Sequence, residues 1–196
     1  MYYILTKRMN DCIPASTTKI MTALLAIENA NLDDQVTISG NADASSFRQM
    51  HRCAALRKEK SGHSGIFLGA LLLYSGNDAA TAIAEYVGGS EEAFVNMMNR
   101  RAQELMANGT HFMNPHGLHD DNHYTTAYDL YLIFNECIKH EDFVNIIQSE
   151  AYTAYYTDVD GNSQEAFVYT DQSLCAGRGG CAGECYDRRW EDRDNG

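Results

Sequence analysis

A serine and a lysine three residues apart, Ser16 and Lys19, stand at the start of an apolar run that reaches Ile27. Pro14 fits just before a helix, and the apolar residues recur at helical spacing, so we expect a buried helix here. Residues at i and i+3 lie on one helix face, which lets the hydroxyl and the amine meet. A desolvated lysine, with a pKa below its reference value of roughly 10.4, can be the base that a serine nucleophile needs. An N-capping serine beside a solvated lysine is the alternative interpretation of this pattern taken alone.

The size and charge of the chain narrow the classes of function. Its 196 residues suit one domain with a real core, or a domain with a small lobe. The formal charge of −12 argues against nucleic acid as a partner and against a basic membrane-binding face. No run of about 20 apolar residues is present, so no membrane-spanning helix is expected. The stretch 1–8 lacks the charged and apolar regions of a signal peptide, and none is predicted.

Periodicity and turn residues predict mostly helices, with short strands between and after them. The elements expected after the first helix are a strand at 36–39, helices at 68–74, 79–87, 90–109, 126–137 and 142–148, and strands at 151–156 and 166–170. Ser90 and Thr126 are the expected N-caps, Asp129 forms a capping-box-like pair with Thr126, and Gly109 is expected to end the helix that Ser90 begins. Apolar spacing predicts the buried faces of these two helices: Phe94, Met97, Met98 and Leu105 on the first, and Leu130, Ile133, Phe134 and Cys137 on the second.

A second short pattern, Ser75-Gly76-Asn77, lies between two helical stretches. Taken alone it can be a helix-ending turn and nothing more. A Ser-x-x-Lys that opens a buried helix, followed later by a Ser-x-Asn turn between helices, is the arrangement used by the superfamily of penicillin-binding proteins and serine β-lactamases. The two patterns together therefore favour an acylation site.

Three longer stretches resemble one branch of that superfamily, the D-alanyl-D-alanine carboxypeptidases. Pro14 to Glu28 is similar to their nucleophile helix, Leu71 to Ser90 to the helix of their second motif, and His111 to Leu130 to the loop and helix that follow. The resemblance implies an α/β (α+β) fold of the β-lactamase/transpeptidase-like type, in which a helical cluster packs against an antiparallel sheet. Residues 1–170 would form the catalytic domain, with a sheet that is incomplete in this chain.

The resemblance also implies a role for each motif residue. Ser16 would be the acylated nucleophile and Lys19 its general base, while Ser75 would relay a proton to the leaving D-alanine. Asn77 would bind the substrate amide and Lys19, and the backbone N–H of Ser16 would be one oxyanion donor. The implied substrate is the peptidoglycan pentapeptide at an extracytoplasmic site in the bacterial cell envelope, with β-lactam antibiotics as mimics that acylate Ser16. The resemblance implies neither a cofactor nor a metal, and it leaves the oligomeric state open.

The chain departs from the family pattern at the third motif, a Lys-Thr-Gly on an edge strand that binds the substrate carboxylate. No lysine follows Lys139, and without that strand acyl transfer is expected to fail or be very slow. Back-translation of 176–195 in the next reading frame permits QGEAAVPENVTIGGGKTGTT, which contains the missing motif. The same test permits family-like segments at 1–10 and 47–69. We hypothesise that these stretches and 171–196 are out-of-frame reads, with 171–196 an unstructured tail; a degenerate gene is the alternative.

Cysteines and histidines could also indicate a metal site, and neither set favours one. The six cysteines are Cys12, Cys53, Cys137, Cys175, Cys181 and Cys185. Only Cys137 lies clear of the three stretches and their edges, on a predicted buried helix face, so a zinc or disulfide framework is not favoured. A cluster of His116, His119, Asp120 and His123 is better interpreted as a polar loop at a helix N-terminus, since the matching family loop needs no metal.

Two other functions remain open from the sequence. A serine β-lactamase usually has Asp where this chain has Gly76, and it needs a deacylating glutamate for which no position is evident. A catalytically dead fragment that binds cell-wall peptides is the non-enzyme alternative. Labelled penicillin separates the three functions. A carboxypeptidase forms a stable adduct, a β-lactamase turns the drug over rapidly, and a dead fragment forms no adduct.

Overall fold

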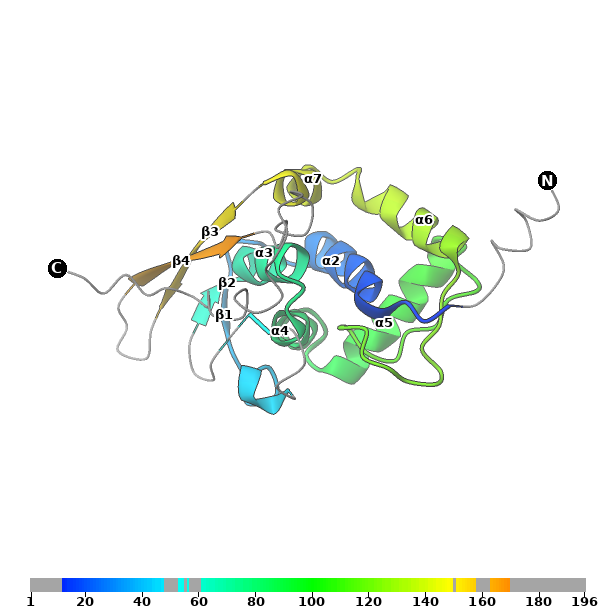
Figure 1. The fold of residues 1–196 in the computed structure, drawn as a ribbon, viewed down its shortest axis with the longest axis horizontal. Coiled ribbons are helices and arrows are strands. Elements are labelled where there is room, and N and C mark those ends of the chain that lie inside the picture. The colour runs from blue at the N-terminus through cyan, green and yellow to red at the C-terminus, as the bar shows by residue number, and fades with distance from the viewer. Residues whose placement is uncertain are drawn as a thin grey trace, which may run out of the picture.

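The computed structural model describes residues 12–47, 53–54, 56, 61–149, 151–157 and 163–169. Figure 1 shows a group of helices gathered around α2 (Thr18–Asn29), with an antiparallel sheet at one end of the molecule. The expected fold class, an α+β arrangement of a helical cluster and an antiparallel sheet, is confirmed. None of the described helices is both long and apolar enough to cross a bilayer.

Helix α2 is the centre of the core. Met21 and Leu24 have no exposed surface, and Leu25 is 3% exposed. Burying each such side chain contributes about 1.5–3 kcal/mol by removing it from water. The helices that pack around α2 are α3 (Ser64–Leu73), α4 (Asn77–Gly88), α5 (Glu91–Glu104), α6 (Ala127–Cys137) and α7 (Glu141–Gln148). The buried helix predicted after Ser16 is therefore present.

Within the described residues the sheet has four antiparallel strands, in the order β1-β2-β3-β4. Their bounds are Gln35–Thr37, Ser61–His63, Ala151–Thr157 and Ser163–Tyr169. Val36 pairs with Gly62, Gly62 with Tyr156, and Ala151 with Tyr169, so β1 and β2 add a short edge to the longer β3–β4 hairpin. Helix α3 contacts β2, β3 and β4, and it thereby connects the sheet to the helices.

The two predicted N-caps are confirmed. Ser90 accepts a hydrogen bond from the backbone N–H of Ala93, and Thr126 accepts one from Asp129. The prediction that Gly109 ends α5 was wrong, because the helix ends at Glu104 and the turn after it contains Met106 at a φ of 61°. The Asp129 carboxylate does not complete a capping box. Oδ2 instead accepts hydrogen bonds from the backbone N–H of Gly109 and from the Thr110 hydroxyl.

One predicted core residue lies at the surface. Ile133 and Cys137 of α6 are fully buried, but Phe134, the next residue round the helix from Ile133, is 40% exposed. Its ring makes a T-shaped contact with Phe143, at a centroid distance of 5.8 Å. Apolar spacing located the buried stripe of α6 and overestimated its width.

The three stretches assigned to other reading frames lie mostly outside the described residues, including 1–10 and 171–196. Part of the middle stretch is described: residues 61–63 form β2 and residues 64–69 begin α3. Ile66, Phe67 and Leu68 are at most 3% exposed. The residues as written thus fill the core at this position, and the reading-frame hypothesis stays a prediction.

Candidate active site

Ser16 lies in a single turn of 3-10 helix, η1 (Ala15–Thr17), that leads directly into α2. The backbone N–H of Thr17 donates to Pro14 O at 3.1 Å, and Ala15 takes a φ of 47°, a value that a residue with a side chain rarely adopts. Such strain persists only where surrounding contacts hold it, and it is common at functional sites. Ser16 itself is exposed, so the turn presents its hydroxyl at the surface of an otherwise buried helix.

Lys19 is buried one turn further on, with 3% of its surface exposed. Its Nζ donates to Asn77 Oδ1 at 2.8 Å and to His116 O at 2.6 Å. These contacts bring the Ser-x-x-Lys and Ser-x-Asn motifs together with the 111–124 loop. The structure thus joins three stretches that lie far apart in the sequence. Burying an amine is costly without hydrogen-bond partners, and the fold supplies them.

The Ser75-Gly76-Asn77 turn joins α3 to α4 in a tight backbone conformation. Ser75 has a φ of 62°, and the backbone N–H of Gly76 donates to Ala70 O at 3.1 Å. A Cβ on Gly76 would lie 2.8 Å from Asp78 Oδ1, so this position has no room for a side chain unless that carboxylate moves. Asn77, 5% exposed, begins α4 with its side chain toward Lys19.

Asp78 is fully buried behind this turn. Its carboxylate accepts hydrogen bonds from the backbone N–H groups of Ala54, Leu56 and Ala79 at 2.7, 3.0 and 2.9 Å. Burial raises the pKa of Asp78, and these backbone hydrogen bonds oppose that rise. The residue thereby fixes Ala54 and Leu56 to the start of α4.

The loop after α5, at residues 114–118, packs against the Ser16 turn and α2. Gly117 has a φ of 84°, and a Cβ on it would lie 1.8 Å from Ala15 O. Asn114 closes the turn, accepting from the backbone N–H of Gly117 at 2.7 Å and donating to Leu118 O at 2.9 Å. The Thr22 hydroxyl of α2 donates to Pro115 O at 2.6 Å. The sequence indicated a turn here but gave no sign that it contacts the residue before Ser16.

A hydrogen bond joins two of the four predicted residues, that from Lys19 Nζ to Asn77 Oδ1. The chain brings the two serines to the same region, since Ser16 lies three residues before Lys19 and Ser75 two residues before Asn77. Catalytic hydrogen bonds often form only with substrate bound, so this geometry is compatible with both serines acting there. His123 is fixed elsewhere, on Thr18 of α2, and so does not point into an open metal site.

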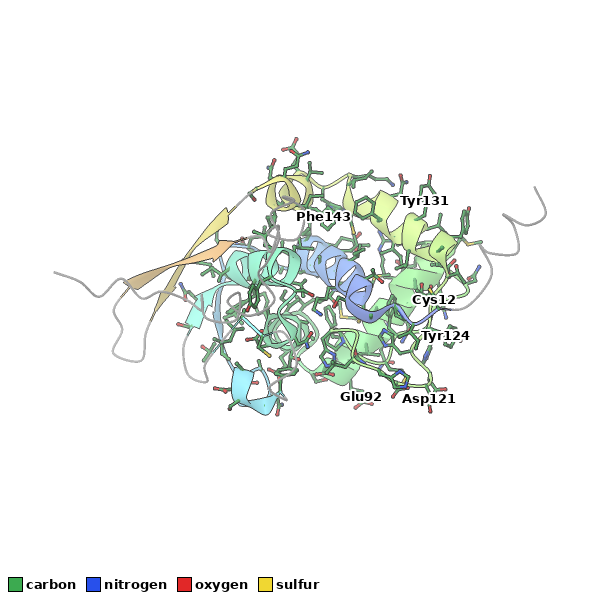
Figure 2. The ribbon with its side chains drawn as sticks, viewed as in Figure 1. Cys12, Glu92, Asp121, Tyr124, Tyr131 and Phe143 are labelled. Carbon is green, nitrogen blue, oxygen red and sulfur yellow. The ribbon has the colours of Figure 1, made fainter. Side chains whose placement is uncertain are left out.

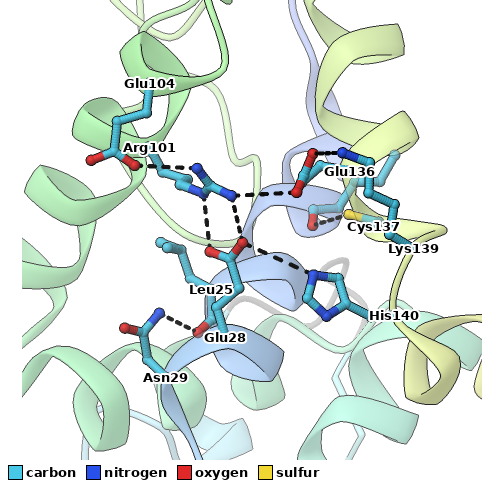
Figure 3. Close-up of polar contacts among 10 residues, drawn as sticks. Leu25, Glu28, Asn29, Arg101, Glu104, Glu136, Cys137, Lys139 and His140 are labelled. Carbon is cyan, nitrogen blue, oxygen red and sulfur yellow. Dashed lines mark hydrogen bonds and ion pairs between the residues drawn. The ribbon is translucent and has the colours of Figure 1, made fainter.

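A second polar cluster lies at the far end of α2 (Figure 3). Arg101 donates to both carboxylate oxygens of Glu28, at 3.0 and 2.6 Å, and it also pairs with Glu104 and Glu136. Glu28, Glu136 and His140 could in principle hold a metal ion, since their ligand atoms lie within 4.8 Å of one another. The Arg101 guanidinium already pairs with both carboxylates, and the bond to Glu28 raises the pKa of Arg101. The cluster therefore connects α2, α5 and α6 as an ion-pair network.

Comparisons with known proteins point to one family. A family model described as D-alanyl-D-alanine carboxypeptidase matches residues 4–183. The chain is 36% identical over 150 residues to D-alanyl-D-alanine carboxypeptidase DacF of Bacillus subtilis, a match that covers 74% of this chain and 36% of DacF. It is 31% identical over 148 residues to DacD of Escherichia coli, covering 71% of this chain and 38% of DacD. The chain thus spans well under half the length of these two relatives.

Solved structures agree with the sequence comparisons. The crystal structure of the Streptomyces K15 DD-transpeptidase superposes with a TM-score of 0.78 at 28% identity, covering 85% of this chain and 67% of that one. The similarity extends beyond the helices that carry the motifs and includes most of the chain. The expected β-lactamase/transpeptidase-like fold is confirmed.

Proposed function

Since the chain belongs to the D-alanyl-D-alanine carboxypeptidase family, we propose that it carries the acylation site of a serine-type D-Ala-D-Ala carboxypeptidase. The observation that supports this most directly is the hydrogen bond of 2.8 Å between Lys19 Nζ and Asn77 Oδ1. It places a buried amine between the two motifs and one helical turn from the exposed hydroxyl of Ser16. A desolvated amine close to a serine is the arrangement that activates a weak hydroxyl nucleophile.

The reaction would proceed in two steps through a covalent intermediate. Ser16 Oγ would attack the carbonyl of the penultimate D-alanine of a peptidoglycan stem peptide, with its proton passing to Lys19 Nζ. Ser75 would relay a proton to the nitrogen of the leaving D-alanine, and water would then hydrolyse the acyl-enzyme. The backbone N–H of Ser16, at the start of a helix, would stabilise the developing oxyanion. Asn77 would hold both Lys19 and the amide of the substrate.

The proposed substrate is the peptidoglycan pentapeptide, which implies action at the bacterial cell envelope. β-Lactam antibiotics would act as mimics that leave Ser16 acylated. The family's Lys-Thr-Gly motif binds the substrate carboxylate, and the chain as written has no such motif. We therefore expect acylation of this chain to be slow, with recognition of the carboxylate as the step that is impaired.

A serine β-lactamase is the second candidate, and the contact around Gly76 disfavours it. That class usually has Asp at this position, but a Cβ here would meet Asp78 Oδ1 at 2.8 Å. An aspartate would also place a second carboxylate beside a buried one that already has a raised pKa. The second motif of this chain is thus built around glycine.

Labelled penicillin tests the proposal directly. We expect a covalent adduct that forms slowly and is then stable on the peptide that contains Ser16, detected by mass spectrometry after long incubation, and no adduct in Ser16→Ala. Rapid turnover of the drug would instead assign the chain to the β-lactamases. A folded sample that forms no adduct would overturn the proposal and support the dead peptide-binding fragment.

A second variant tests the reading-frame hypothesis in the same assay. Residues 176–195 are replaced by QGEAAVPENVTIGGGKTGTT, which restores Lys-Thr-Gly, and a scrambled version of the same segment is the control. We expect the restored variant to be acylated about 100-fold faster, since in the family the strand with Lys-Thr-Gly binds the substrate carboxylate and supplies the second oxyanion N–H. Equal rates in the restored and scrambled variants would contradict the hypothesis.

A further inference from the structure

His123 makes a hydrogen bond to the nucleophile helix that the proposed reaction does not use. Its Nε2 lies 2.8 Å from the hydroxyl of Thr18, a residue 105 positions earlier in the chain. His123 is 2% exposed, and Thr18 is fully buried. Thr18 stands between Ser16 and Lys19 in the chain, so His123 bonds to the motif at a residue that has no role in the proposed reaction.

The hydrogen bonds of His123 define its tautomer. The backbone N–H of Met113 lies 3.0 Å from Nδ1, and a backbone N–H can only donate. Nδ1 is therefore unprotonated, so Nε2 carries the ring proton and donates to Thr18 Oγ1. Burial lowers the pKa of His123, the effect expected for a ring that stays neutral in this site. Phe112 meets the ring edge to face, at a centroid distance of 5.8 Å.

The chain on either side of the Ser16 turn is attached to the same loop. Cys12 and Thr125 exchange backbone hydrogen bonds of 2.8 and 3.0 Å, so the segment before the turn pairs with the segment after His123. Figure 2 shows Cys12 and Tyr124 close together near the start of α2. The backbone N–H of Thr18 donates to Ala15 O, the same oxygen against which Gly117 packs. Thr18 is thus the residue next to the turn that bonds to a side chain of the loop, whereas Lys19 and Thr22 bond to its carbonyl groups.

We propose that His123 is a positioning residue for acylation, which holds the turn carrying Ser16 and Lys19 in register by donating from Nε2 to Thr18. The inference rests on the proposed function, since it concerns the same serine. A shift of the turn by a fraction of an ångström would move Ser16 Oγ relative to Lys19 Nζ, and misplacement of about 1 Å can cost about 100-fold in rate. His123 touches neither substrate nor reacting atoms in this role.

Two substitutions separate this role from simple packing of the loop. His123→Gln keeps a donor where Nε2 stands and loses the acceptor for Met113. His123→Asn keeps the acceptor where Nδ1 stands and loses the donor to Thr18. If His123 positions the turn, the glutamine variant retains acylation and the asparagine variant does not. If His123 only holds the loop through Met113, the order is reversed.

The experiment measures the rate of acylation by a fluorescent penicillin in the full chain. We expect His123→Asn to be at least about tenfold slower and His123→Gln to stay within about threefold of the wild type. Thr18→Val should match His123→Asn, Thr18→Ser should retain the rate, and His123→Asn/Thr18→Val should be no slower than either single variant. His119→Gln is the matched control, because His119 is an exposed residue of the same loop.

Each outcome decides the inference. Equal rates in the asparagine and glutamine variants, or independent effects of His123→Asn and Thr18→Val, would overturn it. If His123→Asn does not fold, the rates of Thr18→Val and Thr18→Ser decide in the same way.

If the wild type is not acylated, the proposed function fails for this chain. Amide exchange at Thr17 and Thr18 then tests the positioning role by itself. Faster exchange in Thr18→Val and His123→Asn but not in His123→Gln supports it, and unchanged exchange overturns it.

Discussion

Lys19 Nζ donates a hydrogen bond of 2.8 Å to Asn77 Oδ1, although 58 residues separate the two in the chain. The bond joins the first turn of α2 to the first turn of α4, and both residues are buried. Because the acceptor is a neutral amide, Asn77 can hold the amine without adding a negative charge that would favour its protonated form.

Asn77→Asp adds that charge with little change in shape. An aspartate carboxylate beside Nζ favours the ammonium form of Lys19, so less free amine is present at neutral pH. We expect acylation at about pH 7 to slow by about tenfold for each unit by which the lysine pKa rises, and to recover as the pH is raised. The measurement is the pH profile of acylation, with Asn96→Asp on the exposed face of α5 as the control. An unshifted profile would show that Lys19 is not the base.

Gly117→Ala tests the contact beneath the Ser16 turn. A Cβ on Gly117 would lie 1.8 Å from Ala15 O, so we expect a loss of about 2–4 kcal/mol in the free energy of unfolding and strongly slowed acylation. Gly89→Ala is the matched control, because Gly89 has a φ of 76° but nothing within 4 Å of its Cβ position. Gly89→Ala should lower the free energy of unfolding by about 1 kcal/mol and leave the acylation rate unchanged. Urea denaturation measures stability and penicillin labelling measures acylation. Equal losses of stability in Gly117→Ala and Gly89→Ala would contradict the contact.

Stability should depend on pH through His123. Burial lowers the pKa of His123 in the folded state, and nearby His111 acts in the same direction while Asp120 opposes it. The unfolded chain then binds more protons below its ordinary histidine pKa of about 6.5, so folded stability is lost as the pH falls through that value. We expect the loss between about pH 7.5 and about pH 5.5 to be smaller in His123→Gln than in the wild type or in His119→Gln. Denaturation midpoints across this pH range measure the loss of stability. The same pH dependence in His123→Gln as in the wild type would refute the prediction.

Arg101→Met tests the ion-pair network at the far end of α2. Methionine keeps an apolar stem and removes the guanidinium that bonds both oxygens of Glu28. We expect a loss of about 1 kcal/mol in the free energy of unfolding, which shrinks at high salt because the Arg101 side chain is 22% exposed. The exposed neighbour Arg100 provides the control, as Arg100→Met. The acylation rate should not change, and a change would mean that the network also affects the Ser16 turn.

Local features of the fold could be predicted from the sequence because they depend on neighbours in the chain. Ser90 and Thr126 cap helices by bonding to backbone N–H groups three residues later, a contact set by helix geometry alone. Phe134 shows the limit of this reasoning. Its spacing suggests a buried position, but how much of a helix face is covered depends on where α7 lies, and the ring remains 40% exposed.

For the candidate site, the residue types and their local placement could be predicted from the sequence alone. Ser16 lies in the turn that leads into the apolar helix α2 and Lys19 in the first turn of that helix, while Ser75-Gly76-Asn77 lies between α3 and α4. The contacts that these residues make depend on the packing of the whole fold: Lys19 bonds Asn77 and the His116 carbonyl, Gly117 packs against Ala15, and His123 bonds Thr18. Helical spacing follows from backbone geometry within one turn, whereas these contacts arise from the packing of α4 and the 111–124 loop against α2, which no local pattern encodes.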